Sequence, residues 1–164
     1  MSIPVSIDPM GTLGAGKELT FVQPLYNDSG VLLRQPNVPM HVSGTSSEAN
    51  EEWCVFRAEN GSREDSYCWR WFAGGQIVLQ FERAVKITSL KVIQTSFLFA
   101  DFYATALTLE ADGSNIASAT GLGPDDMAGV TLMPNQPVFA TEYKLKITGI
   151  ASFAHLGISA EIKP

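Results

Sequence analysis

A chain of 164 residues is long enough to form one ordinary domain whose core needs neither a metal nor a disulfide to hold it together. Hydrophobic residues make up 45% of it and charged residues only 17%, which indicates a folded protein with a sparsely charged surface. Eleven basic against seventeen acidic residues give a net charge of -6 without any basic run, which argues against nucleic acid as a partner.

The beginning of the chain predicts neither export nor membrane insertion. Residues 1–9 have no positively charged region and no continuous apolar run, so we expect no cleaved secretory signal. No window approaches the roughly 18 apolar residues of a membrane span. The protein is expected either to work where it is made or to leave the cell by another route, of which assembly into a virus particle is one.

Residues 1–38 differ from the rest because prolines and glycines interrupt every long element. Short strands are predicted at 19–22 and 30–33. We interpret residues 1–38 as an N-terminal arm or edge extension, packed on its own domain or on a neighbouring chain, and residues 39–164 as the main domain. Residues 11–17 have P-loop spacing, but Glu18 replaces the Ser or Thr that binds magnesium, and no strand–helix context surrounds the motif, so nucleotide binding is rejected.

From Met40 onward the sequence is typical of short strands. Apolar and polar residues alternate, and turn signals such as Asn60-Gly61, Asp112-Gly113 and Gly123-Pro124 separate the runs. No segment has a convincing helical period. Strands are predicted at 77–81, 85–93, 107–109, 130–132, 143–147 and 156–162. Many short strands with regular turns predict an all-β sandwich or barrel.

Several of these segments, over about three quarters of the chain, resemble the discoidin family of galactose-binding-like β-sandwiches, although none is diagnostic alone. The resemblance is carried by a turn at Val55-Phe56-Arg57-Ala58-Glu59-Asn60-Gly61, a following tryptophan at Trp69 or Trp71, and the segments Ile77 to Phe81, Leu107 to Asn115, Tyr143 to Ile147 and Leu156 to Ile162, the last with Glu161 in an acidic position. It implies a jelly-roll β-sandwich that binds surfaces and sugars and rarely catalyses a reaction.

The sequence also departs from this family. Many extracellular members join their ends by a disulfide, which Cys54 and Cys68 cannot supply. These two cysteines flank one loop, so a single bridge between them and two buried thiols both remain open. Within the broad family the sequence is most similar to short modules of phage tail and capsid proteins, which implies a place in the virion.

An aromatic and basic cluster is the strongest signal for a binding site. Sugars present flat C–H faces that stack on aromatic rings, while Arg and Asn reach their hydroxyls, and protein partners use the same residue types. The alternative is that the tryptophans plug one end of the core. The predicted ligand-binding residues, for a glycan or a protein partner, are Trp53, Arg57, Asn60, Arg63, Tyr67, Trp69, Arg70 and Trp71.

No constellation predicts catalysis or a cofactor. His41 and His155 lack a third metal ligand at a recognisable spacing, and both are interpreted as structural histidines. No nucleophile motif is present. Adjacent carboxylates on a strand point to opposite faces, so they do not form an acid–base pair. Asp125-Asp126 is interpreted first as a turn and second as a calcium site.

The sequence therefore supports two functions. The first is a non-catalytic structural protein of a virion, a phage tail or capsid component that assembles with itself or with other virion proteins through residues 1–38 and displays a sandwich able to bind host-surface glycans. The alternative is a free-standing, lectin-like carbohydrate-binding module. An enzyme with an unrecognised site is the third and least supported hypothesis.

Overall fold

The computed structural model describes residues 19–44, 52–61, 69–71, 75–94, 103–149 and 151–164. Arg63, Tyr67, Cys68, the P-loop-like segment 11–17 and residues 1–10 lie outside these ranges. Two short 3₁₀ helices, η2 and η4, accompany the strands, and no helix of the described residues is long and apolar enough to cross a membrane. The elements are β1 (Leu25–Tyr26), β2 (Leu32–Arg34), β3 (Met40–Gly44), η2 (Glu52–Cys54), β4 (Trp69–Trp71), β5 (Gln76–Gln94), β6 (Ala104–Ala111), β7 (Ser114–Ala119), η4 (Pro124–Ala128), β8 (Val130–Leu132), β9 (Phe139–Gly149) and β10 (Ala151–Ile162).

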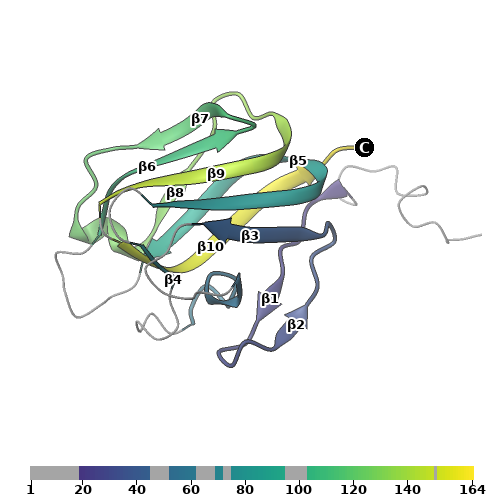
Figure 1. Cartoon of the computed structure of the whole chain (residues 1–164), viewed down its shortest axis with the longest axis horizontal. Helices are drawn as coiled ribbons and strands as arrows, with labels where there is room; N and C mark the ends of the chain where they lie inside the picture. The colour runs from purple at the N-terminus through teal and green to yellow at the C-terminus, as the bar shows by residue number, and fades with distance from the viewer. Residues whose placement is uncertain (1–18, 45–51, 62–68, 72–74, 95–102, 150) are drawn as a thin grey trace, which may run out of the picture.

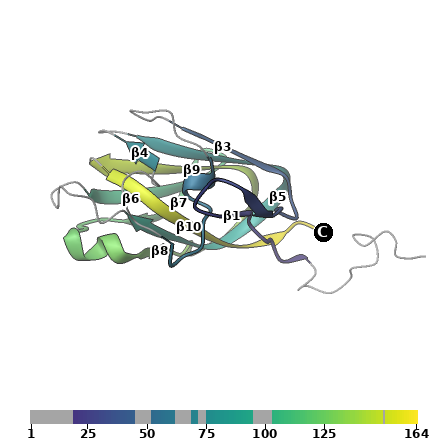
Figure 2. The ribbon, with the colours of Figure 1, turned by 90° about the horizontal axis from the view of Figure 1, so that it is seen from below.

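The long strand β5 belongs to both layers of an antiparallel sandwich (Figures 1 and 2). Its first part pairs with β3 and β9, and β9 continues to β6 and β7. Its second part pairs with β10 and β8, and β10 continues to β4. The register with β9 shifts between Gln80 and Val85, and the strand bends there. The predicted all-β sandwich is confirmed, but the predicted strands 77–81 and 85–93 are one strand, because residues 82–84 contain no glycine or proline to end it.

The core lies between the layers and follows the predicted alternation. On β9, Tyr143, Leu145 and Ile147 are buried while Lys144 and Lys146 point outward, as predicted for a strand with one face on the core. Three aromatic rings meet edge to face across the core: the ring centroids of Phe21 and Phe81 are 5.4 Å apart, and those of Phe81 and Tyr143 are 6.0 Å apart.

Two predicted turns have different outcomes. Asp112 and Gly113, with φ of 46° and 90°, form the two-residue turn between β6 and β7, as the Asp-Gly signal predicts. The segment after Gly123 is the 3₁₀ helix η4 rather than a simple turn. There the Asp126 Oδ2 atom accepts a hydrogen bond of 2.8 Å from the Gly123 N–H, so this carboxylate caps the helix.

The described part of the N-terminal segment, residues 19–38, packs on the sandwich. Phe21 and Val38 are buried in the core. The Phe21 N–H donates to the Ala160 carbonyl at 2.9 Å, and Thr20 forms an isolated bridge with Glu161, so this segment covers the outer edge of β10. Residues 19–22 make only this bridge instead of the predicted strand, while β1 and β2 form a separate hairpin that projects from the sandwich (Figure 1). The domain boundary at residue 38 stays a prediction.

Candidate functional site

Three predicted site residues lie in residues 52–61, between β3 and β4, a segment that packs against the β1–β2 hairpin. The Trp53 ring, half-buried, packs on Gly30, where a Cβ would come within 3.3 Å of the ring. Gly30 has a φ of 80°, a conformation that also favours glycine. Arg57 is only 1% exposed, and its Nη1 lies 2.9 Å from the Asp28 Oδ1 atom. Trp53 and Arg57 therefore anchor the hairpin, while Asn60 is exposed in the turn that follows.

The remaining described site residues, Trp69, Arg70 and Trp71, form the edge strand β4. This strand pairs antiparallel with Ala151–Phe153 at the start of β10. Figure 1 shows β4 at one end of the sandwich, far from the C-terminus, where β3, β5 and β9 also begin or end. The backbone of β4 and the ends of several strands thus lie together at one end of the sandwich, away from the β1–β2 hairpin.

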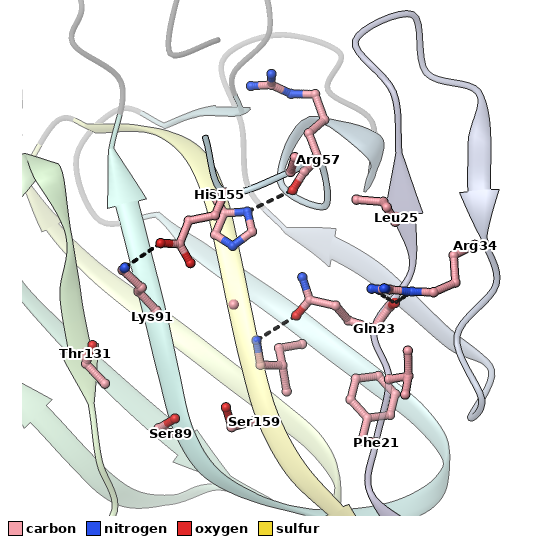
Figure 3. Close-up of a pocket in the computed structure, with 15 residues that line it drawn as sticks. Phe21, Gln23, Leu25, Arg34, Arg57, Ser89, Lys91, Thr131, His155 and Ser159 are labelled. Atoms are coloured by element: carbon pink, nitrogen blue, oxygen red, sulfur yellow. Dashed lines mark hydrogen bonds and ion pairs between the residues drawn. The ribbon is translucent and has the colours of Figure 1, made fainter. Parts of the chain in front are cut away.

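A groove of about 530 Å³, which the sequence did not predict, crosses the outer face of β10 (Figure 3). We call it the β10 groove. Residues 21–25 and Arg34 form one wall, residues 57–59 close one end, and the outward side chains of β5, β8 and β10 form the floor. Its size lies within the range of about 300–1,000 Å³ typical of small-molecule sites.

Strand register explains the floor of the β10 groove. Residues directly opposite each other on antiparallel strands lie on the same face. Ser159 is opposite Ser89, and Gly157 is opposite Lys91, which in turn is opposite Thr131 on β8. Hydroxyls and one ammonium group therefore line this floor, and at Gly157 the backbone is not covered by a side chain.

A β-bulge at Ala154 directs His155 into the groove. Phe153 is opposite Gln94 and His155 is opposite Ile93, so Ala154 is an extra residue on β10. The bulge reverses the alternation: without it, Phe153 would share the outward face with His155 and Gly157. With it, Phe153 is fully buried in the core, and His155 lies on the groove side.

The hydrogen bond of His155 fixes its tautomer. Its Nδ1 lies 2.9 Å from the Arg57 carbonyl oxygen, which can only accept, so Nδ1 carries the proton. Burial lowers the pKa of His155 below its usual value of 6.5, against the opposing effect of the Arg57 carbonyl. The imidazole is therefore neutral at pH 7, and its Nε2, next to Gly157, is an acceptor. The Arg57 guanidinium points away from the groove (Figure 3).

We expect the free energy of unfolding to fall as the pH drops from 7.5 to 5.5. Unfolded, His155 takes up a proton near pH 6.5, whereas the folded state binds it only at lower pH. Within that window the unfolded chain carries more protons, so acid favours unfolding. The carboxylate of Glu59, whose pKa is lowered from 4.5, loses its contribution only below this window.

Urea unfolding at several pH values measures this effect. The control is His155→Asn, whose amide can still donate to the Arg57 carbonyl but does not titrate. Its stability should change less with pH than that of the natural chain. Equal pH dependence in both proteins would show that His155 is not the responsible group.

Two cationic side chains, Lys91 and Arg34, stand at the rim of the β10 groove. The Lys91 Nζ lies 2.7 Å from the Glu59 Oε2, and this hydrogen bond and charge hold the pKa of Glu59 low. On the opposite wall, the Arg34 Nε and Nη2 donate to the Gln23 carbonyl at 3.2 and 2.9 Å. The Gln23 side chain is itself fixed to β10 and bonds the Leu156 carbonyl and the Ile158 N–H, at 2.9 and 2.6 Å.

The described residues contain no group of three or more His, Cys, Asp or Glu side chains that could hold a metal ion. His41 is exposed on β3 in one layer, and His155 is buried on β10 in the other, so the two histidines do not face each other. Cys54 is buried in the core.

The chain has the fold of a galactose-binding-like β-sandwich, which is the fold of discoidin domains. No protein-family model matches the chain, and no curated protein matches its sequence. Solved structures do match. A family 32 carbohydrate-binding module of Clostridium perfringens NanJ, in complex with galactose, has a TM-score of 0.55 and 19% identity over 74% of this chain and 93% of its own.

Two further structures share the fold. A second family 32 module of Clostridium perfringens, in complex with GalNAc-β-1,3-galactose, has a TM-score of 0.55 and 19% identity, and the match covers 74% of this chain and 94% of that one. Allantoicase of Saccharomyces cerevisiae has a TM-score of 0.59 and 12% identity over 74% of this chain but only 40% of its own. The fold thus occurs both in carbohydrate-binding modules and in a protein named as an enzyme.

Proposed function

We propose that the chain is a non-catalytic carbohydrate-binding module whose glycan site lies at the β4 end of the sandwich. The supporting observation is the position of β4, which holds two tryptophans, Trp69 and Trp71, in an edge strand where several strands end. Modules with this fold were solved with galactose and with GalNAc-β-1,3-galactose. A galactose-containing glycan is therefore the first ligand to test.

Three of the described carboxylates have structural partners, which favours binding over catalysis at these positions. Asp28 pairs with Arg57, Glu59 with Lys91, and Asp126 caps η4. General acid–base chemistry would need carboxylates free to exchange protons with a substrate. These three instead hold a hairpin, a rim and a helix in place.

Substituting Trp69 or Trp71 by Ala is expected to weaken galactose binding by at least about 30-fold, since the loss of a central aromatic contact typically costs about 2 kcal/mol or more. Calorimetric titration with galactose and with GalNAc-β-1,3-galactose measures this. Trp71→Phe, which keeps an aromatic face, should retain part of the affinity. The control is Val138→Ala, at an exposed residue outside β4.

Unfolding in urea separates binding from folding. A tryptophan that contacts the glycan should leave stability nearly unchanged on substitution. A tryptophan in the core should instead cost about 3–5 kcal/mol when replaced by Ala. Full binding by both alanine variants, or loss of binding only because the chain unfolds, would contradict the proposed site.

The virion role and self-assembly through residues 1–38 stay predictions. Because residues 19–38 carry core side chains, the informative comparison is between the full chain and residues 19–164. A full-length oligomer that becomes a monomer in the shorter chain, measured by light scattering, would support assembly through the terminal arm. A monomer in both would contradict it.

A further inference from the structure

We propose that the β10 groove is a second binding site, separate from the β4 end, for a hydroxylated carboxylate of the size of an acidic monosaccharide. Gly157 in the groove is opposite Lys91, and Phe153, the partner of Trp69, is opposite Gln94, so the two positions lie three residues apart along β5, or about 10 Å. A ligand at the β4 end and a ligand centred at Gly157 can therefore bind independently.

The charge of the groove selects an anion. Arg34 and Lys91 are cations at its rim, and Glu59, the acid among the lining residues, is already bonded to Lys91. Arg57 contributes its carbonyl to the groove but directs its charge to Asp28. The lining thus carries a surplus of positive charge on a chain whose net charge is -6, and such a local excess attracts negatively charged ligands.

Arg34 is held in place to receive a carboxylate. Its guanidinium is fixed by two hydrogen bonds to the Gln23 carbonyl, and Gln23 is clamped on β10 through its own side chain. An arginine has five N–H donors in a planar fork, which matches the two oxygens of a carboxylate. Among the described residues, Gln23 is the only bonded acceptor of Arg34, so donors remain for a ligand. Because the side chain is already ordered, binding costs less conformational entropy.

The rest of the groove suits ligand hydroxyls. The unprotonated His155 Nε2 accepts a hydrogen bond, and the hydroxyls of Ser89, Ser159 and Thr131 both donate and accept. Gly157 keeps this surface open, because a Cβ there would lie 3.2 Å from the His155 Nε2 and 3.5 Å from the Lys91 Cβ. A ring that bears several hydroxyls and one carboxylate, as in a uronic acid, would place its carboxylate at the cationic rim and its hydroxyls on the polar floor of the groove.

The test is a titration of the full chain with D-glucuronate, followed by NMR or calorimetry, with D-glucose as the neutral match and sulfate as a simple anion. Glucuronate should bind in the millimolar range or tighter, and glucose and sulfate should each bind at least about tenfold more weakly. No binding of glucuronate, equal binding of glucose, or equal binding of sulfate would each overturn the proposal.

Variants locate the site. Arg34→Gln should weaken glucuronate binding by about tenfold or more, since a hydrogen-bonded charge is lost. The affinity of Arg34→Lys should lie between that of the natural chain and that of Arg34→Gln, because lysine keeps the charge without the planar fork of donors. Arg83→Gln is the matched control, since Arg83 is half-buried and is also bonded to a backbone carbonyl, that of Lys163, but does not line the groove. If Arg34→Gln and Arg83→Gln bind glucuronate equally well, the site is elsewhere.

Trp71→Ala distinguishes this site from the glycan site. It should leave glucuronate binding unchanged, whatever it does to galactose. If glucuronate binding is lost in Trp71→Ala but retained in Arg34→Gln, the acidic sugar binds at the β4 end and the groove is not a site. Failure of galactose binding in the natural chain would contradict the proposed glycan function without affecting the outcome in the groove.

Discussion

Removing residues 1–38 is expected to leave a chain that does not fold stably. The deletion takes away Phe21 and Val38, two buried core side chains whose burial contributes about 3–6 kcal/mol in total. That is a large part of the roughly 5–15 kcal/mol by which a domain is stable. It also uncovers β10, whose Leu156, Ile158 and Ala160 backbone groups bond residues 21–23. Exposed strand edges promote association between chains.

Circular dichroism, urea unfolding and light scattering measure this effect. The matched control is the chain of residues 19–164, which keeps every described contact and should remain folded. The deletion of residues 1–38 should give either aggregates or an unfolding transition at much lower urea. An identical unfolding midpoint for the two truncated chains would show that residues 19–38 do not support the sandwich.

Tyr143→Phe is expected to lower the free energy of unfolding by about 2–4 kcal/mol, because the change leaves buried backbone groups without their partner. The Tyr143 hydroxyl lies 2.7 Å from the Val85 carbonyl and 2.9 Å from the Val138 carbonyl, so its single proton has two acceptors within reach. It also accepts a hydrogen bond of 3.2 Å from the Ile87 N–H. These contacts hold β5 where it bends from one layer to the other.

The variant keeps the ring and its edge-to-face contact with Phe81, so the hydroxyl alone is tested. Tyr103→Phe is the control: Tyr103 is only half-buried, and its change should stay within about 0.5 kcal/mol, as for most surface substitutions. Urea unfolding measures both. If the two variants are equally stable, the bend of β5 does not depend on this hydroxyl.

The alternation of apolar and polar residues is enough to predict those strands that have one face on the core and contain no bulge or bend. Tyr143 to Ile147 and Leu156 to Ile162 are of this kind, and the Asp112-Gly113 turn follows from local conformational preference. Alternation alone could not locate the bulge at Ala154, because two small or apolar residues in a row fit either face. Nor could it show that 77–81 and 85–93 are one strand, since at the bend β5 contacts β9 and the Tyr143 hydroxyl, which lie more than fifty residues further along the chain.

The binding residues were harder to predict because their roles depend on distant segments. Nothing in the local sequence of Arg57 reveals that it is buried and paired with Asp28, so the sequence alone predicts it as a ligand-binding residue. The β10 groove combines Gln23 and Arg34 with Lys91 and His155, which together span more than a hundred positions of the chain. The signal that could have suggested it is the polar outward face of β10, namely Gly157 and Ser159 after His155. Trp69 and Trp71 stay predicted ligand contacts.

The position of β5 has a consequence for the rate of folding. The β6–β7 hairpin closes over a two-residue turn and can form within about 1–10 μs. β5, in contrast, takes its partners from residues 40–44 before it and from strands as far along the chain as residue 162. Contacts between segments so far apart require large loops to close first, which places all-β sandwiches in the range of about milliseconds to seconds. We therefore expect the joining of β10 to β5 to limit the rate of folding.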